Sequence, residues 1–451
     1  MKKILIRSGK DYFTNISPEA TFSYRKTSTF GHNVGFYLIS DAVYKLISTP
    51  DTQITVDSFS IGTKKSYKRN VAETIDENFD SFVIPAADFL KPEQIKHLKR
   101  LTILIKNLDI PICVLGLGIG AYIDSYRFND EKTDKVVKNF ISSILEKSDS
   151  IGVRGQLTFN YLNKLGFDES QIKVLGCPSI YLNGANYNIK PPSIDTNSKI
   201  ALNITPSVKK YTPFVDKTIK KYKNYKYFMQ DARDLKILLY GENDIITGNS
   251  TVSSYKNILD DNKAIFPIET RIWIDELKNY DYAIGTRLHG TIAALNAGIP
   301  GTLIVHDSRT QEIADYHKIP HLKIDEIDKN TSIEDIANNS NWEEFNKVSK
   351  TNYKDLVKFF KVNKIDITKE YPNPIIDKKE KEIRINRIVE QIYSKSKGIN
   401  EKELLSRINY LSNKEFYDYK PPFSVKNEKS SQKVNKGKNS KFNKIKKIIK
   451  K

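Results

Sequence analysis

The sequence of 451 residues is poor in cysteine and has no long apolar segment. Its two cysteines, Cys113 and Cys177, are too few for a disulfide framework and lack metal-ligand spacing, so we expect reduced thiols and a cytoplasmic protein. No run of about 18 apolar residues occurs, and we expect no membrane-spanning helix. The opening MKKILIRSG has too short an apolar stretch for a secretory signal. These features argue against secreted disulfide-rich domains and integral membrane proteins.

Positive charge is concentrated at the end of the sequence. The net charge is +19, and residues 426–451, with eleven lysines and one glutamate, supply +10 of it. The body of the chain is therefore only moderately basic. No aromatic platform or known nucleic-acid module accompanies the terminal lysines, so we expect no nucleic-acid partner.

The last eleven residues, 441–451, read KFNKIKKIIKK. At helical spacing, Phe442, Ile445, Ile448 and Ile449 share one face that is surrounded by lysines. A basic amphipathic helix of this kind binds anionic membrane surfaces, which would place the protein peripherally at the inner face of the cell membrane. The alternative is a disordered, solubilising end, and the sequence leaves both interpretations open.

Apolar β-branched runs alternate with helical patterns along most of the chain, as in SIGVRG, QLTFNYLNKLG and IKVLGCPS from residue 150 onward. This alternation predicts βαβ units with parallel sheets. The polar, proline-containing residues 188–199 interrupt it and predict a linker. We therefore predict an α/β fold with two Rossmann-like domains facing a central cleft, residues 1–187 and 200–397. Residues 398–451 are predicted to be a short helix and a lysine-rich, partly disordered tail.

Basic side chains follow three of the predicted strands. His289 comes after YAIGT and Arg309 after TLIVH, each in the first turn of a helix, and Arg154 ends SIGVRG in the first domain. The carboxyl ends of parallel strands share one edge, where helix N-termini favour anions. These positions predict a cleft for a small polyanion. From spacing alone, burial of His289 as a core residue is an equally good interpretation.

The segment YAIGTRLHGTIAALNAGIPGTLIVHDSR resembles the signature of the polysaccharide pyruvyltransferase family. SIGVRGQLTFNYLNKLG with IKVLGCPS is similar to a second region of that family, and GLGIGA to its glycine-rich loop. GHNVGFYLISDAVYKLI is a looser match to its Asn-x-Gly opening. The resemblance covers roughly residues 30–325. It implies a fold like that of glycosyltransferases of type B (GT-B), with the active site between the domains.

The resemblance also implies a reaction. The donor would be phosphoenolpyruvate, a co-substrate, and pyruvate would become a ketal on a sugar of a cell-surface polysaccharide, with a glycan or lipid-linked saccharide as acceptor. The donor-binding residues of the family fall on Arg154, His289 and Arg309, together with Arg287 and Gly290 of the same motif; relatives often carry lysine in place of Arg309. His289 is the predicted catalytic residue, as a proton carrier or a phosphate ligand.

The glycine-rich loops are candidates for the acceptor side of the cleft: Asn33, Gly35, Gly116, Gly118 and Gly120. Their alternative role is loop geometry alone. We expect no metal and no cofactor, because arginines and helix ends can neutralise the charge of the donor. The main rival function is a nucleotide-sugar-dependent glycosyltransferase of the GT-B type, and a third is a non-catalytic glycan- or membrane-binding protein.

A cysteine and three histidines outside the constellation have structural interpretations. Cys177 is expected to be a small buried side chain. His306 either orients Arg309 or is purely structural. His317, like His321, lies farther along the chain and is expected at the surface or in a loop.

Overall fold

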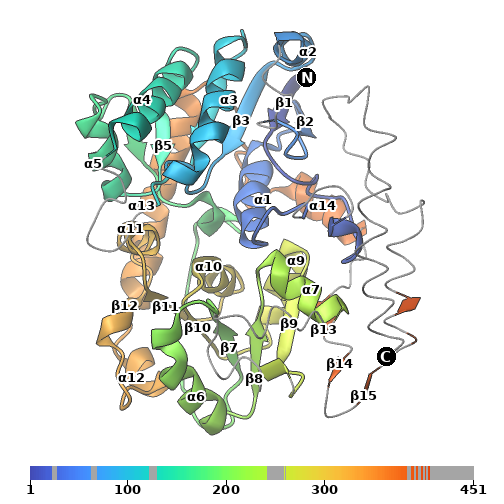
Figure 1. Cartoon of the computed structure of the whole chain (residues 1–451), viewed down its shortest axis with the longest axis vertical. Coiled ribbons are helices and arrows are strands. Elements are labelled where there is room, and N and C mark those ends of the chain that lie inside the picture. The colour runs from blue at the N-terminus through green and yellow to red at the C-terminus, as the bar shows by residue number, and fades with distance from the viewer. Residues whose placement is uncertain are drawn as a thin grey trace.

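The computed structural model contains two α/β halves, one above the other along the longest axis of the molecule (Figure 1). The described residues are 1–22, 28–61, 69–120, 130–240, 258–259, 261–382, 388–390, 393–394, 398–399, 402 and 405–406. The predicted membrane-binding segment 441–451 and most of the predicted tail lie outside these residues.

The first half contains a four-stranded sheet in the order β2-β1-β3-β4, parallel throughout. A parallel pair, β5 and β6, continues from it through a bridge between Leu117 and Val153. The strands are β1 (Lys2–Ile6), β2 (Thr52–Val56), β3 (Ser81–Pro85), β4 (Ile112–Leu115), β5 (Ile151–Val153) and β6 (Ile172–Val174). The helices are α1 (Gly35–Ile47), α2 (Arg69–Asn78), α3 (Ile95–Lys106), α4 (Glu131–Leu145) and α5 (Gln156–Lys164), with the short η1 (Ala20–Phe22), η2 (Pro92–Gln94) and η3 (Pro178–Tyr181).

The second half contains a seven-stranded sheet in the order β12-β11-β10-β7-β8-β9-β13, in which only β13 is antiparallel to its neighbour. The strands are β7 (Ile200–Asn203), β8 (Tyr225–Phe228), β9 (Ala264–Pro267), β10 (Tyr282–Gly285), β11 (Gly301–Val305), β12 (His321–Lys323) and β13 (Ile388–Glu390). The helices are α6 (Thr212–Lys221), α7 (Ala232–Tyr240), α9 (Thr270–Leu277), α10 (Leu288–Asn296), α11 (Ser308–His317) and α12 (Ile333–Asn338), with η4 (Lys209–Tyr211) and η6 (Ile324–Glu326). A separate short pair is formed by β14 (Tyr393–Ser394) and β15 (Gly398–Ile399).

These two sheets confirm the predicted fold class. Apolar runs such as ICVL in β4 are buried along their whole length, as expected for parallel strands covered on both faces. Residues 188–199, the predicted linker, form no helix or strand.

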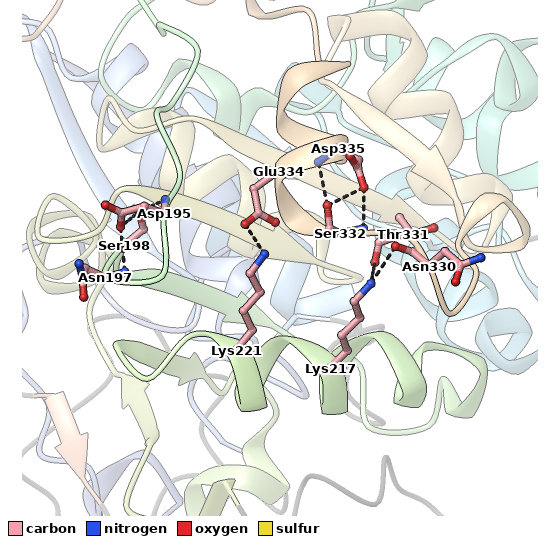
Figure 2. A network of polar contacts seen from close by, with 10 residues as sticks. All are labelled: Asp195, Asn197, Ser198, Lys217, Lys221, Asn330, Thr331, Ser332, Glu334 and Asp335. Carbon is pink, nitrogen blue, oxygen red and sulfur yellow. Dashed lines mark hydrogen bonds and ion pairs between the residues drawn. The ribbon is translucent and has the colours of Figure 1, made fainter.

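Polar contacts fix the outer edge of the second half, where α6 lies beside α12 (Figure 2). Lys217 Nζ donates to the main-chain carbonyls of Lys329, Asn330 and Thr331 at 2.8–3.3 Å. One turn further along α6, Lys221 forms an ion pair with Glu334 at 2.5 Å. Lys217 thereby satisfies carbonyl groups that no strand or helix uses, and Lys221 adds an ion pair to α12.

The chain returns to the first half after the second sheet. Helix α13 (Trp342–Val362) begins in the second half, where the indole of Trp342 packs edge-on against Tyr282. Beyond its end, the amide of Asn363 bonds to Ser150, and Thr368 N donates to Leu46 O at 2.8 Å. The next helix, α14 (Pro374–Glu382), lies beside α1 (Figure 1). A segment that we predicted as part of the second domain therefore packs on the first.

Buried contacts join the two halves. Helix α1 of the first half packs against α9 and α10 of the second, within one continuous apolar core. A buried ion pair accompanies them, because Lys10 Nζ lies 2.9 Å from Glu269 Oε2. Helix α10, which carries His289, therefore packs against both halves of the molecule.

Candidate active site between the two halves

A cavity of about 500 Å³ opens between the halves, and residues from both line it. Its wall includes Arg154, His289 and Arg309, the three residues of the strand-edge argument, together with Arg287. The wall also includes Arg7, Asn33, Phe59, Asp88, Phe89, Gln94, His97 and His306.

The turn from β10 into α10 places His289 at the cavity. Two glycines let this turn approach Asn203 of β7 closely: a Cβ on Gly285 would lie 1.9 Å from its carbonyl oxygen, and one on Gly290 would lie 2.0 Å from its side-chain oxygen. Thr286 N donates to the same carbonyl at 2.7 Å. Gly290 is therefore packed against β7 and is not among the cavity-lining residues.

The imidazole of His289 sits between the halves. Its Nε2 lies 3.8 Å from Cys177 Sγ, and its Nδ1, Cγ and Cβ atoms lie against Gly35 at the start of α1. Burial, reinforced by Arg154 and Arg309, lowers the pKa of His289 to about 3. The ring is therefore uncharged at neutral pH and can accept a proton or a hydrogen bond.

Arg154 is almost fully buried, and the glycine-rich loop supports it. Its Nε donates to Gly116 O at 2.9 Å, and a Cβ on Gly118 would lie 2.7 Å from its Cδ. Gly116 adopts φ +73°, which favours glycine. Gly120 lies against Lys91. The three glycines are not among the cavity-lining residues; the structure places them around basic side chains.

Arg309 is held by two carboxylates. Its Nη2 donates to Asp307 Oδ2 at 2.8 Å and its Nη1 to Asp88 Oδ2 at 3.4 Å across the cleft. Lys91 Nζ also contacts Asp88, at 2.5 Å. Burial would raise the pKa of Asp88, but Arg309, Lys91 and Arg154 lower it to about 2. His306 Nε2 lies 3.7 Å from Asp307, so this histidine shares a carboxylate with Arg309.

Arg287 forms an ion pair with Asp231, and its Nε donates to Ile204 O at 3.3 Å. The same Asp231 accepts from Asn33 Nδ2 at 2.9 Å, and the two residues form an isolated bridge between the halves. Asn33 Oδ1 in turn accepts from Gly35 N at 2.7 Å. Asn33 and Arg287 therefore meet at one carboxylate, which fixes the start of α1 beside His289.

Sequence reasoning missed several wall residues. The guanidinium of Arg7 lies over the rings of Phe59 and Phe89, at 5.4 and 5.8 Å from their centroids, and its Nη2 is 3.4 Å from His97 Nε2. Arg7 follows β1 and Asp88 follows β3, so both lie at the strand edge that singled out Arg154 and Arg309. Their positions directly after predicted strands could have identified them from the sequence.

The predicted surface position of His317 is wrong. The side chain is fully buried, and its Nε2 accepts from Cys177 N at 2.9 Å. Burial lowers its pKa to about 3. A Cβ on Gly176 would lie 1.9 Å from this nitrogen, so the Gly176 turn closes over the ring. His317 thereby fixes the backbone of Cys177, whose thiol lies beside His289.

In the part of the chain that the structure describes, no group of three or more His, Cys, Asp or Glu side chains is placed to hold a metal ion. No helix in the same part is long and apolar enough to cross a membrane. Both cysteines are buried and unpaired.

Comparisons with solved structures find distant similarities of fold. An uncharacterized protein from Klebsiella pneumoniae is 12% identical with a TM-score of 0.39, over 71% of this chain and 93% of its own. The UDP-GlcNAc 2-epimerase of Methanocaldococcus jannaschii is 11% identical with a TM-score of 0.42, over 80% and 100%. That of Neisseria meningitidis is 10% identical with a TM-score of 0.37, over 85% and 100%. These values are too low to transfer any property of those proteins.

Sequence comparison is more specific. No curated protein matches the chain. The family model described as polysaccharide pyruvyl transferase, however, matches residues 33–308, well over half of the 451 residues. The match extends from Asn33 to the first turn of α11 and includes Arg154 and His289. The chain therefore belongs to the polysaccharide pyruvyl transferase family of transferases.

Proposed function

We propose that this chain transfers the pyruvyl group of phosphoenolpyruvate to two hydroxyls of a sugar in a cell-surface polysaccharide, forming a ketal and releasing phosphate. The supporting observation is the convergence of Arg154 from the first half with His289 and Arg309 from the second on one cavity. Family membership supports pyruvyl transfer as the reaction type.

The charges in the cavity suit a donor with a phosphate and a carboxylate. Arg287 and Arg309 already have acidic partners in Asp231 and in Asp307 and Asp88. Among the described residues, no carboxylate lies within ion-pair distance of Arg154; its Nε donates to the carbonyl of Gly116, and its charge acts on Asp88 and Glu312 from further away. Its remaining N–H groups can bind an anionic group in a bidentate manner. Arg154 is therefore the cation from which the donor gains most.

His289 fits the proton transfers of the reaction. Ketal formation forms two C–O bonds to the sugar and breaks the C–O bond to phosphate. Of the two hydroxyl protons removed, one is added to the methylene carbon of the donor and the other leaves with the phosphate. In the empty cavity the pKa of His289, about 3, makes it a weak base. A bound anionic donor offsets the nearby arginines and raises this pKa toward the range where imidazole transfers protons efficiently. His289 thus becomes an effective base in the donor complex.

The acceptor sugar is assigned to the wall formed by the first half. Phe59, Phe89, Gln94 and His97 line that wall together with Arg7. Aromatic rings and convergent polar groups are typical of pockets that bind organic ligands. The acceptor would be a glycan or a lipid-linked saccharide, and attachment to the membrane through residues 441–451 stays a prediction.

Calorimetric titration tests the donor directly. Phosphoenolpyruvate is expected to bind the wild-type protein and to bind the Arg154→Ala variant much more weakly. Binding of a nucleotide sugar alone would overturn the proposal in favour of the GT-B glycosyltransferase. Mass analysis of the surface glycan then tests the reaction. Cells with the His289→Ala variant are expected to lose pyruvylated sugar, whereas unchanged glycan would indicate a non-catalytic protein.

A further inference from the structure

An aspartate of the first half reaches an arginine of the second across the cavity. Asp88, which follows β3, lies with one oxygen, Oδ2, 3.4 Å from Arg309 Nη1 and 2.5 Å from Lys91 Nζ. Its side chain is 23% exposed and that of Arg309 is 36% exposed. The pair is therefore partly open to the cavity into which a donor would enter.

The contacts that the two carboxylates make with Arg309 differ in length. Asp307, on the same helix end as Arg309, is 2.8 Å from Nη2, whereas Asp88 is 3.4 Å from Nη1. A charge-assisted hydrogen bond of ordinary strength is 2.7–2.9 Å long. The contact with Asp88 is thus the weaker of the two, and breaking it leaves Arg309 anchored by Asp307.

We propose that Asp88 is a positioning residue that occupies the place of the donor anion against Arg309 in the empty cavity and is displaced from it when the donor binds. This inference rests on the proposed function. An anionic oxygen of phosphoenolpyruvate accepts a hydrogen bond from Nη1 of Arg309, while Asp307 continues to accept one from Nη2. Asp88 remains compensated by Lys91, so the exchange leaves no uncompensated carboxylate in the cavity.

The affinity for the donor then depends on the charges of Asp88 and Lys91 in opposite directions. Asp88 competes with the donor, so removing its charge strengthens binding. Lys91 draws Asp88 away from Arg309, so removing Lys91 weakens binding. If Asp88 or Lys91 were merely structural, its replacement would weaken donor binding or leave it unchanged. Stronger binding by the Asp88→Asn variant is therefore the distinguishing result.

Calorimetric titration with phosphoenolpyruvate tests these opposite signs. The Asp88→Asn variant is expected to lower the Kd about five-fold or more. Lys91→Gln is expected to raise it, and Asp88→Glu to leave it near the wild-type value. Asp109→Asn, which removes the same charge at a side chain that is 93% exposed, is expected to have no effect. The effect of Asp88→Asn is expected to vanish in a chain that also carries Arg309→Ala.

Each contrary result has a distinct meaning. If wild-type protein binds the donor but Asp88→Asn binds it equally or less well, the inference is wrong and the proposed function stands. If the gain persists in the Arg309→Ala background, Asp88 acts through general charge and the inference is again wrong. If the wild-type protein does not bind phosphoenolpyruvate, the proposed function fails and the inference fails with it. Should Asp88→Asn not fold, Asp88→Ser removes the same charge and is judged by the same expected fall in the Kd.

Discussion

Gly35 of the first half and His289 of the second are in direct contact: a Cβ on Gly35 would lie only 2.6 Å from Nδ1 of the imidazole. The Gly35→Ala variant is therefore expected to displace the ring and to lower kcat/KM on the order of 100-fold, because small displacements of a catalytic group are costly. The melting temperature should stay close to that of the wild type. Gly301→Ala is the control, since its nearest atom is Cγ2 of Thr291 at 3.3 Å and neither residue lines the cavity. Equal losses in both variants would argue against the contact.

Replacement of Arg154 separates charge from shape. Arg154→Lys keeps the positive charge but loses the planar group that can bind an anion through two N–H donors. We expect the Kd for phosphoenolpyruvate to rise about 10- to 100-fold, the effect of losing a charge-assisted hydrogen bond. Arg69→Lys on α2, where the side chain is 85% exposed, should leave the Kd unchanged. An Arg154→Lys protein with wild-type affinity would show that charge alone binds the donor.

The protonation of His289 can be followed by NMR of the imidazole signals, identified by comparison with the His289→Gln variant. Because burial and the nearby arginines lower its pKa to about 3, the empty protein should show no transition for this ring between pH 8 and pH 5. Addition of phosphoenolpyruvate should raise the pKa, because the donor brings negative charge. A transition near the ordinary histidine pKa of about 6.5 in the empty protein would contradict the described environment.

The buried His317 links stability to pH. Its folded pKa of about 3 lies below the value of about 6.5 in an unfolded chain. The unfolded state therefore binds more protons between these values, and stability falls as the pH is lowered from 7 to 5. This histidine should account for about 2 kcal/mol of that loss. His317→Gln keeps an acceptor for Cys177 N but cannot titrate, so chemical denaturation should show a smaller loss.

His321 provides the control for this experiment. Its hydrogen bond with Asp315 raises the pKa, so its contribution to stability is present at low pH and is lost as the pH rises. His321→Gln should therefore enlarge the difference in stability between pH 7 and pH 5. If both substitutions changed it in the same direction, the assigned environments would be wrong.

The sequence predicted the fold class and the position of the main basic residues, for one physical reason. Parallel strands place their carboxyl ends at one edge, so residues directly after YAIGT, TLIVH and SIGVRG are brought together whatever the loops do. Arg154, His289 and Arg309 line one cavity for that reason.

The roles of the glycines could not be read in the same way. A missing side chain leaves room, but the sequence does not show whether a ligand or another side chain fills it. Gly118 makes room for Arg154 and Gly290 for Asn203, partners 36 and 87 residues away. His317 was misplaced for a similar reason, because the turn at Gly176 that covers it is distant in the sequence.

The segment after α13 ties the end of the second half to the first half, and these ties affect unfolding. Asn363 bonds to Ser148 and Ser150, and Asn373 bonds to the carbonyl of Lys45 at the end of α1. A protein ending at residue 340 would retain all residues on the cavity wall but would lose these ties. Since α1 also supports His289, the loss would reach the imidazole of this residue. Proteolytic removal of the last helices should therefore abolish activity and lower the cooperativity of unfolding, although no wall residue is removed.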